Sequence, residues 1–418
     1  IIGYDTRDRS EWIATHLANH LSDNTEVEIS DRPVPTPSIA WYAGYNQYVD
    51  LAISATASHN PPEYNGIKIL ESNGADASEE LTTQIEEYAK THLESENNNP
   101  SAESEPETKC FVDEYKNYLH EQFHDRINEN HTVLYDAVNG TGSNMFDELL
   151  EQLECQVETV NNRTNSGLMG LEPNPSKIDT EWMTKKIQDN EADIGFVSDC
   201  DADRLKVVTE NGKIDGSDLL AVLYDHLSNR DQENRINAVR TVGAGSLIDR
   251  IAQSNNGEVF ESPIGFKHTA RLAEEKNAVI SGDQTDGYCY PTHLLNKDGL
   301  YTAMIILEMI DTESITNRIE RIKSEHGERY AGRASVDCAD HNKETVMNQI
   351  NSDGLPQLSE PTDVNRIDGV KLYYEDNWIL IRPSGTEPKI RVYAESDDES
   401  TTQDLIQQAE EHINRITT

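Results

Sequence analysis

The stretch of sequence that decides the fold is Thr56-Ala57-Ser58-His59-Asn60-Pro61-Pro62-Glu63-Tyr64-Asn65-Gly66-Ile67-Lys68. The largely apolar run at 48–53 predicts a buried strand, so the stretch begins as the loop at the exit of that strand. The double proline fixes two φ angles, and Asn65-Gly66 favours a tight turn. The loop therefore presents one serine hydroxyl as a potential nucleophile, with His59 available to exchange a proton and Lys68 to supply positive charge.

A second polar loop follows the strand predicted at 192–197 and reads Asp199-Cys200-Asp201-Ala202-Asp203-Arg204. In an extended loop alternate side chains point the same way, so the three carboxylates converge and Cys200 and Ala202 face the other side. Converging carboxylates repel one another unless a cation lies between them. Because all the ligands are oxygen atoms, Mg²⁺ or Ca²⁺ is favoured over zinc.

Two other interpretations of this acidic loop exist. The spacing also begins a calcium-binding EF-hand, with Glu210 at its twelfth position. However, Arg204 occupies the sixth position, where an EF-hand needs glycine, and the flanking segments predict strands and not helices. The remaining alternative is a solvated acidic turn without a ligand.

Another polar loop, the C-terminal loop, lies near the end of the chain and reads Arg382-Pro383-Ser384-Gly385-Thr386-Glu387-Pro388-Lys389-Ile390-Arg391. Its hydroxyl and backbone N–H groups, together with the planar guanidinium groups of Arg382 and Arg391, have the composition of a phosphate-binding loop. A basic hairpin tip with no ligand is the alternative. A serine nucleophile, a hard-cation loop and a phosphate-binding loop together indicate phosphoryl transfer.

Predicted strands and helices alternate through most of the chain, which favours α/β units, and the last 85 or so residues read as a small α+β domain. The polar stretch at 94–108 predicts a loop or a short disordered insertion. A further predicted strand at 277–283 leads into the polar loop Ser281–Gly287. Ligands of open α/β sheets bind at the carboxyl ends of strands, so the loops of three units can face one central cleft.

The composition is strongly acidic. Asp and Glu number 77 against 35 Lys and Arg, which gives a formal net charge of -42. This charge argues against a nucleic-acid or anionic-membrane partner. Because the acid is dispersed along the chain, it fits a protein from a high-salt cytoplasm, where self-repulsion is screened. An ordinary acidic protein is the alternative.

The cysteines and the apolar segments indicate a cytoplasmic protein. The five cysteines (Cys110, Cys155, Cys200, Cys289 and Cys338) form no Cys-x-x-Cys motif and predict free thiols in a reducing compartment. The longest strongly apolar run, at 300–307, is far shorter than the roughly 20 residues of a membrane span. The sequence predicts no signal peptide, and it opens directly on a predicted strand at 1–4.

Three of these loops resemble loops of the α-D-phosphohexomutases. The stretch 56–68 resembles the family's phosphoserine loop, 199–204 its metal loop and 382–391 its phosphate-binding loop. This family comprises the phosphoglucomutases, phosphomannomutases and phosphoglucosamine mutases. Weaker matches occur at 3–7, 35–37, 264–267 and 297–299, so the resemblance runs nearly end to end. It implies three similar α/β domains with mixed sheets and a C-terminal α+β domain around a central cleft. The expected domain limits are 1–128, 129–236, 237–330 and 331–418.

The resemblance also implies an activity, the interconversion of hexose 1-phosphate and hexose 6-phosphate. A phosphorylated Ser58 would exchange its phosphoryl group with the sugar through a hexose 1,6-bisphosphate, assisted by His59, Lys68 and Arg204. Mg²⁺ would be held by the Ser58 phosphate with Asp199, Asp201 and Asp203. The residues expected to bind the substrate are Lys267, Asp283, Thr285, Arg382, Ser384, Gly385, Thr386 and Arg391. The partner is a small sugar phosphate, and the protein is expected to be a monomer or homodimer.

Two features depart from the family pattern. The sugar-selecting loop usually contains Gly-Glu-x-Ser-Gly, but here it reads Gly282-Asp283-Gln284-Thr285-Asp286-Gly287, which adds a negative charge at Asp286. The arginine-bearing segment that precedes the first strand in the family is not in this chain, which predicts trimming or an incomplete enzyme. These departures motivate one alternative, a non-catalytic sugar-phosphate-binding relative. A Mg²⁺-dependent phosphatase is a further alternative.

Overall fold

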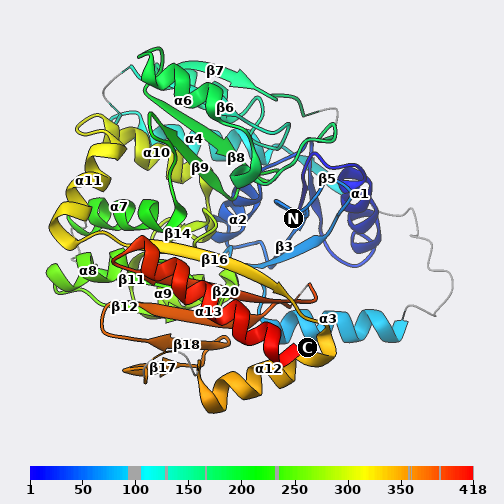
Figure 1. Cartoon of the computed structure of the whole chain (residues 1–418). Coiled ribbons are helices and arrows are strands. Elements are labelled where there is room, and N and C mark those ends of the chain that lie inside the picture. The colour runs from blue at the N-terminus through cyan, green and yellow to red at the C-terminus, as the bar shows by residue number, and fades with distance from the viewer. Residues whose placement is uncertain are drawn as a thin grey trace.

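In the part of the chain that the computed structural model describes, four five-stranded sheets follow one another (Figure 1). The structure describes residues 1–92, 105–127, 130–164, 167–230, 235–355, 358, 360–385 and 387–417. Within these ranges no helix combines the length and the apolar character that a membrane crossing requires. All five cysteines are free thiols, as predicted.

The first sheet has the order β4-β3-β1-β2-β5. Its strands are β1 (Ile2–Tyr4), β2 (Glu28–Ser30), β3 (Leu51–Ala55), β4 (Ile67–Glu71) and β5 (Glu107–Lys109). The associated helices are α1 (Ser10–Leu21), α2 (Thr36–Tyr45), α3 (Glu79–His92) and α4 (Phe111–Phe123). The prediction of a loop over 94–108 is wrong at its end, because the backbone of 107–109 pairs with β2. The rest of that prediction lies mainly outside the described residues.

The second sheet has the order β10-β9-β8-β6-β7, and the third has the order β12-β11-β13-β14-β15. The second unit contains β6 (Thr132–Asp136), β7 (Gln156–Val160), β8 (Ile194–Ser198), β9 (Leu205–Thr209), β10 (Gly212–Lys213), α5 (Phe146–Gln152), the 3₁₀ turn η1 (Pro175–Lys177) and α6 (Glu181–Gln188). The third sheet contains β11 (Asn237–Thr241), β12 (Val259–Ser262), β13 (Ala278–Gly282), β14 (Tyr288–Tyr290) and β15 (Leu294–Lys297). The helices that follow β10 are α7 (Gly216–Ser228), α8 (Leu247–Ser254), α9 (Phe266–Glu275), α10 (Gly299–Ile310) and α11 (Ile315–His326).

These three sheets share one arrangement. In each sheet, one strand pairs with a parallel strand on one side and with an antiparallel strand on the other. The antiparallel strand is the next one along the chain: β4 follows β3, β9 follows β8 and β14 follows β13. The three connections are the serine loop (56–66), the acidic loop (199–204) and the third loop (283–287). They occupy the same place in each sheet, at the carboxyl end of the last parallel strand, where ligands of α/β sheets bind.

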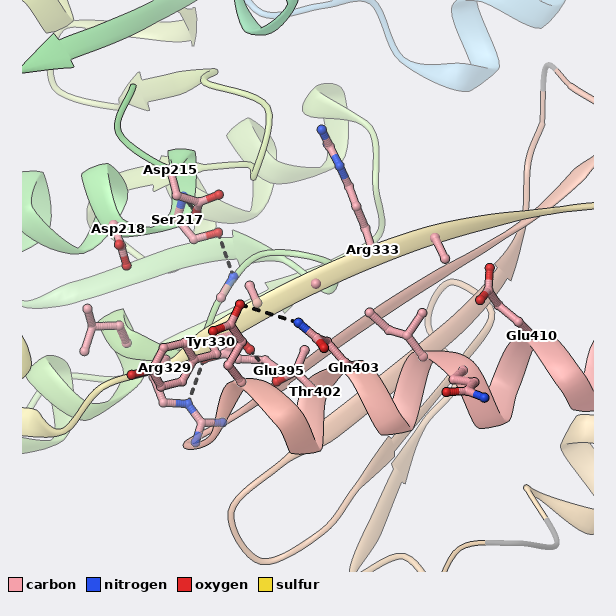
Figure 2. Close-up of a pocket in the computed structure, with 18 residues that line it drawn as sticks. Asp215, Ser217, Asp218, Arg329, Tyr330, Arg333, Glu395, Thr402, Gln403 and Glu410 are labelled. Carbon is pink, nitrogen blue, oxygen red and sulfur yellow. Dashed lines mark hydrogen bonds and ion pairs between the residues drawn. The ribbon is translucent and has the colours of Figure 1, made fainter. Parts of the chain in front are cut away.

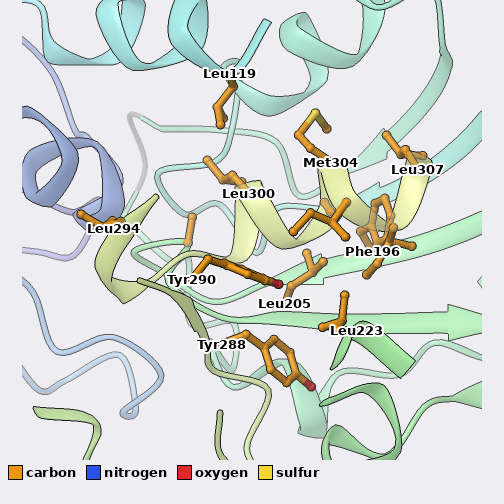
Figure 3. Packing of buried hydrophobic residues seen from close by; sticks show 14 of the residues in the cluster. Leu119, Phe196, Leu205, Leu223, Tyr288, Tyr290, Leu294, Leu300, Met304 and Leu307 are labelled. Atoms are coloured by element: carbon orange, nitrogen blue, oxygen red, sulfur yellow. The ribbon is translucent and has the colours of Figure 1, made fainter. Parts of the chain in front are cut away.

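One apolar core joins the first three units. Helix α10 is apolar on nearly all sides, and its Leu300, Met304 and Leu307 lie close to side chains of other elements, such as Phe196 and Leu205 (Figure 3). A helix that is hydrophobic all round needs to be covered on every face, and β9, α4, α7 and α11 all contact it. The side chain of Asp298 caps its first turn by accepting a hydrogen bond from Tyr301 N.

The fourth sheet is entirely antiparallel, in the order β16-β20-β19-β18-β17, and has a separate core. Its elements are β16 (Tyr330–Asp337), α12 (Asp340–Asp353), β17 (Asp363–Asn365), β18 (Val370–Tyr373), β19 (Trp378–Pro383), β20 (Lys389–Ser396) and α13 (Glu399–Thr417). Three α/β units with mixed sheets and an antiparallel C-terminal unit confirm the predicted fold class.

The fourth unit is attached to the third through buried polar contacts. Glu395 accepts hydrogen bonds from Ser246 N (2.8 Å) and Trp378 Nε1 (3.0 Å), and Arg329 Nε lies 2.8 Å from it. A cavity of about 600 Å³ lies beside this contact, between the start of α7, the start of β16 and α13 (Figure 2). Its lining contains none of the residues predicted for the functional site.

Candidate active site

The backbone conformation of Ser58 sets the direction of its side chain. Its φ angle is +51°, in the left-handed region, and its N–H donates to Thr56 Oγ1 at 2.9 Å. The hydroxyl donates to Asp199 Oδ2 at 2.7 Å, across 141 residues of sequence, and lies 3.4 Å from His59 Nδ1. The predicted nucleophile and the predicted acidic loop are therefore in direct contact.

The side chain of Arg7 holds the serine loop in shape. Arg7 is buried and donates to the carbonyl oxygens of Pro61 (2.7 Å), Asn60 (2.6 Å), Tyr64 (3.2 Å) and Ser58. Its Nε lies 3.2 Å from Asp5 Oδ2. Sequence reasoning gave Arg7 no role, although it stands in the weakly matching segment 3–7 at the exit of the first strand.

The acidic loop is a tight turn between β8 and β9. The antiparallel pairing of these strands excludes the helices of an EF-hand. Asp199, Asp201 and Asp203 are fully buried, and one oxygen atom of each lies within 4.8 Å of the others. Ala202 has a φ of +55°, so the carboxylates converge through a turn and not through the extended loop that was predicted. The Cys200 thiol lies away from the carboxylates' shared site and donates to Asp5 Oδ2 at 3.3 Å.

Two lysines lie against the acidic loop. Lys68 Nζ is 2.6 Å from both Asp201 Oδ2 and Asp203 Oδ2, and Lys297 Nζ is 2.7 Å from Asp203 Oδ2. The sequence identified Lys68 as a nearby cation. Lys297 was predicted only as part of the weak match at 297–299. Nothing in the local sequence shows that β15 brings this residue to the acidic loop.

Arg204 links the acidic loop to the third loop. Its Nη1 donates to Thr285 O at 3.4 Å, and its backbone N–H donates to Asp199 Oδ1 at 3.2 Å. The guanidinium group is buried among acids, and Asp283, Asp203 and Asp199 raise its pKa although desolvation opposes the charge. Arg204 is therefore a fixed positive charge beside Ser58 and the carboxylates.

The pKa values of Asp199 and Asp203 are shifted in opposite directions. Burial, followed by the charges of Asp203 and Asp201, raises the pKa of Asp199 well above its usual range. Burial also opposes the charge of Asp203, but Lys297, Lys68 and Arg204 outweigh it and hold its pKa below the usual range. The surrounding cations therefore neutralise one side of the cluster better than the other.

His59 and Lys68 differ in charge. Desolvation and the nearby positive charges of Arg204 and Lys297 lower the pKa of His59 to about 3, so its imidazole is neutral near pH 7. Desolvation disfavours the charge on Lys68, but Asp201 and Asp203 outweigh it and raise its pKa. In this arrangement Lys68 supplies charge, and His59 is the neutral group next to the hydroxyl.

The acidic loop has the donor set of a hard-cation site. Among the described residues, Asp201 Oδ1 and Asp203 Oδ1 are buried and have no hydrogen-bond partner. A buried carboxylate oxygen without a partner is costly, and a divalent cation satisfies it. The residues therefore fit Mg²⁺ or Ca²⁺, and the absence of thiolate or imidazole donors disfavours zinc.

The third loop closes on itself. Asp283 Oδ1 accepts from Thr285 N (2.7 Å), Thr285 Oγ1 (2.8 Å) and Gly287 N (3.3 Å). The extra charge at Asp286 is buried and lies 2.5 Å from Lys206 Nζ. Asp286 thus faces the second unit, and its charge is compensated within the protein.

The remaining predicted residues lie in two other places. Lys267, in the first turn of α9, lies 3.8 Å from Glu79 Oε2. Arg382 Nε lies 3.0 Å from Asp368 Oδ2, and that same oxygen accepts from Ile264 N, just upstream of Lys267.

The other members of the C-terminal loop are partly engaged with one another. Ser384 Oγ accepts from Glu387 N at 3.2 Å, Gly385 is exposed, and Thr386 lies outside the described residues. The Arg391 guanidinium pairs with Glu387 and donates to Ser335 Oγ at 2.5 Å. The described residues of the C-terminal loop do not contact Ser58.

Comparison with protein families covers most of the chain. The models for the phosphoglucomutase/phosphomannomutase alpha/beta/alpha domains I, II and III match residues 1–96, 109–212 and 215–330. The model for the C-terminal domain matches residues 335–412. The four matches follow in the order of the four sheets.

Individual relatives cover nearly the whole chain. A phosphoglucosamine mutase of Methanococcus vannielii is 30% identical over 415 residues, which are 97% of this chain and 90% of that protein. A phosphoglucomutase/phosphomannomutase of Thermococcus kodakarensis is 28% identical over 97% of this chain and 88% of its own.

Solved structures share the fold. A phosphoglucomutase/phosphomannomutase family protein from Burkholderia thailandensis superposes with a TM-score of 0.83 at 20% identity, covering 99% of this chain and 88% of its own. An Aspergillus fumigatus N-acetylphosphoglucosamine mutase in complex with GlcNAc-6P and magnesium gives a TM-score of 0.61 at 14% identity, covering 92% of this chain and 93% of its own. With all four domain models matched in order, the chain belongs to the phosphoglucomutase/phosphomannomutase family, the α-D-phosphohexomutases.

Proposed function

We propose that this protein is a phosphohexomutase that interconverts hexose 1-phosphate and hexose 6-phosphate. The observation that carries the proposal is the 2.7 Å contact between Ser58 Oγ and Asp199 Oδ2, inside a buried cluster of three carboxylates and three cations. Such a cluster suits phosphoryl transfer, in which positioning and charge stabilisation provide most of the catalysis. No observation favours the non-catalytic or phosphatase alternatives.

In the proposed reaction phosphorylated Ser58 donates its phosphoryl group to the free hydroxyl of a bound hexose monophosphate. The bond between phosphorus and Ser58 Oγ breaks and a bond to the sugar oxygen forms. The sugar hydroxyl loses its proton to neutral His59, which returns it to the departing Ser58 Oγ, 3.4 Å from His59 Nδ1. The resulting hexose 1,6-bisphosphate turns over and returns its other phosphoryl group to Ser58. A loose transition state needs no strong base, so a weakly basic imidazole suffices.

Mg²⁺ is the proposed cofactor. Asp199, Asp201 and Asp203, with the phosphate on Ser58, would hold it, and when bound it supplies positive charge for the transferring group. The fungal N-acetylphosphoglucosamine mutase was solved with magnesium, which supports this choice. Lys68 and Arg204 add fixed positive charge at the same place.

The substrate contacts form two groups. We assign the sugar hydroxyls to Asp283 and Thr285, with Lys267 at the edge of the third unit. We assign the non-reacting phosphate to Arg382, Ser384, Gly385, Thr386 and Arg391. We propose domain limits of 1–128, 129–236, 237–330 and 331–418, the last of which falls one residue after β16 begins at Tyr330.

The test is the substitution Ser58→Ala, with Ser352→Ala, an exposed serine on α12, as the matched control. Mutase turnover is measured with glucose, mannose and glucosamine phosphates in molar KCl, with Mg²⁺ and a trace of hexose 1,6-bisphosphate. Ser58→Ala should lose about 10⁴-fold or more in kcat, because no nucleophile remains. Intact mass should show one phosphate on the unmodified protein and on Ser352→Ala, and none on Ser58→Ala. Near-normal turnover by Ser58→Ala refutes the mechanism.

A further inference from the structure

Asp286 has an unusual environment for a loop aspartate. Its φ is +68°, in the left-handed region, which is uncommon for residues other than glycine, and it is only 2% exposed. Its Oδ1 lies 2.5 Å from Lys206 Nζ, and its Oδ2 accepts from Ser176 Oγ at 3.1 Å. Both partners belong to the second unit, whereas Asp286 belongs to the third.

The partner Lys206 lies on β9, three residues after Asp203. It is 6% exposed, and its Nζ also donates to Ile214 O at 3.0 Å. Outside such a pair, a buried ammonium group of this kind would be strongly destabilising. The ion pair is therefore a fixed connection between the strand that leaves the acidic loop and the turn of the third loop.

Backbone contacts reinforce this connection. Leu205 N donates to Asp286 O at 3.2 Å, and Arg204 Nη1 donates to Thr285 O at 3.4 Å. Three consecutive residues of the second unit, 204–206, thus hold residues 285–286.

The first residue of α7, Gly216, also packs closely against this turn. A Cβ atom added at Gly216 would lie 3.0 Å from Asp286 Oδ1 and 3.0 Å from Gln284 O. The turn therefore has little room to shift away from β9.

We propose that Asp286 and Lys206 are positioning residues that set where the third loop holds the sugar relative to Ser58, and that they thereby influence which hexose phosphate reacts. This inference rests on the proposed mutase function. Asp283 and Thr285 lie within three residues of Asp286, in a loop closed by hydrogen bonds to Asp283 Oδ1. We call the ion pair of Asp286 with Lys206 the anchor of the third loop. A change in the anchor therefore moves both proposed sugar contacts together.

The experiment compares Asp286→Asn, Lys206→Met and the double variant with the unmodified full chain. Kinetics are measured with glucose 1-phosphate and mannose 1-phosphate, which differ only at C2, under the conditions given above. Asp286→Asn should raise KM about tenfold and change the ratio of kcat/KM between the two sugars by about threefold or more, because a small displacement alters contacts to one hydroxyl. Its kcat should stay within about threefold.

Two readouts separate positioning from stability. The double variant removes both buried charges, so its thermal midpoint should lie above that of Asp286→Asn while the changed sugar ratio persists. Lys186→Met, which removes the partner of Glu158 at the surface, should leave both KM and the ratio unchanged.

An unchanged KM and sugar ratio in both single variants would overturn the inference. So would an equal loss with both sugars that follows the fall in thermal midpoint, since that result indicates a purely structural role. If the unmodified protein turns over none of the hexose phosphates and carries no phosphate on Ser58, the proposed function fails instead. Calorimetric binding of glucose 6-phosphate and mannose 6-phosphate then tests the anchor alone, and an affinity ratio that is the same in Asp286→Asn, or an absence of binding, overturns it.

Discussion

At the scale of single residues, the aim of Ser58 depends on its backbone. A left-handed φ costs a non-glycine residue about 1–2 kcal/mol, and here the hydrogen bond from Ser58 N to Thr56 Oγ1 helps to hold it. With φ reversed, the hydroxyl would not point at Asp199. The proposed nucleophile is therefore oriented by the protein itself, before any substrate binds.

His59 gives a prediction at this scale. Its pKa of about 3 in the folded protein lies below its value near 6.5 in the unfolded chain, so the unfolded chain binds more protons between these pH values. The contribution of His59 to the free energy of unfolding therefore rises with pH from about 3 to about 6.5 and is fully present above that. Replacing His59 by Gln should reduce the loss of unfolding free energy between pH 7 and pH 4 by about 1–2 kcal/mol, a figure discounted for the partial exposure of the ring.

The measurement is urea unfolding at pH 4, 5, 6 and 7, with His16→Gln as control because that histidine is exposed on α1. Equal acid sensitivity in His59→Gln and the unmodified protein would contradict the assigned protonation. The control variant should keep the full acid sensitivity.

At the scale of elements, the site consists of loops that need support from neighbouring segments. Arg7 lies beyond the end of β1 and satisfies four carbonyl oxygens of the serine loop. Replacing Arg7 by Met leaves Asp5 buried without its counter-charge, which should cost about 3–5 kcal/mol of unfolding free energy. Turnover should fall about 100-fold, because Ser58 is no longer held in place.

Exposed Arg9, two residues further on, provides the control for this prediction. Arg9→Met should change the free energy of unfolding and kcat very little. Chemical denaturation and steady-state kinetics measure both quantities, and an Arg7→Met enzyme with normal kcat would show that the serine loop keeps its shape alone.

The turn at 139–142 supports the acidic loop in a similar way. A Cβ at Gly140 would lie 2.6 Å from Cys200 O and 3.0 Å from Asp199 O, both backbone atoms that cannot move independently. Gly140→Ala should therefore displace the acidic loop, cost about 1–3 kcal/mol of unfolding free energy and weaken activation by Mg²⁺ about tenfold.

The check is a Mg²⁺ titration of mutase activity after chelation, with thermal unfolding measured in parallel. Gly170→Ala is the comparison, because an added Cβ there meets nothing within 4 Å although its φ of +75° costs about 1 kcal/mol. A Gly140→Ala enzyme with an unchanged Mg²⁺ requirement would count against this role of the turn.

At the scale of the whole molecule, surface charge determines how the substrate approaches. The protein carries a formal charge of -42 and the proposed substrate is an anion, so the two repel each other at long range. The Debye length falls from about 10 Å at 0.1 M salt to about 3 Å at 1 M. We expect kcat/KM to rise from 0.1 M into molar KCl, by about tenfold, as the repulsion is screened.

The measurement is kcat/KM between 0.1 and 3 M KCl, with circular dichroism at each point to separate binding from unfolding. A maximum at the lowest salt, with the fold intact throughout, contradicts this prediction. Substitution of exposed acids far from the site should shift the curve in the same way as salt.

Much of the fold and part of the site could be predicted locally. Each key loop directly follows a predicted strand, so the polar residues at 56–60, 199–204 and 282–287 were identifiable from the strand pattern and from their own composition. Arg7 and Lys297 received no role because their importance comes from partners far away in sequence. Asp286 was identified as a charge, but whether it faced the substrate or the interior depended on the position of Lys206.

The sequence by itself determined which residues are candidates for the chemistry, because strand periodicity, turn residues and carboxylate spacing are local properties of the chain. Only the tertiary structure decided which of them meet. In the tertiary structure Ser58 lies beside Asp199, Lys68 between Asp201 and Asp203, and Asp286 against Lys206. Those contacts span 80 to 141 residues and depend on how separate sheets pack around the α10 core, which no short-range pattern specifies.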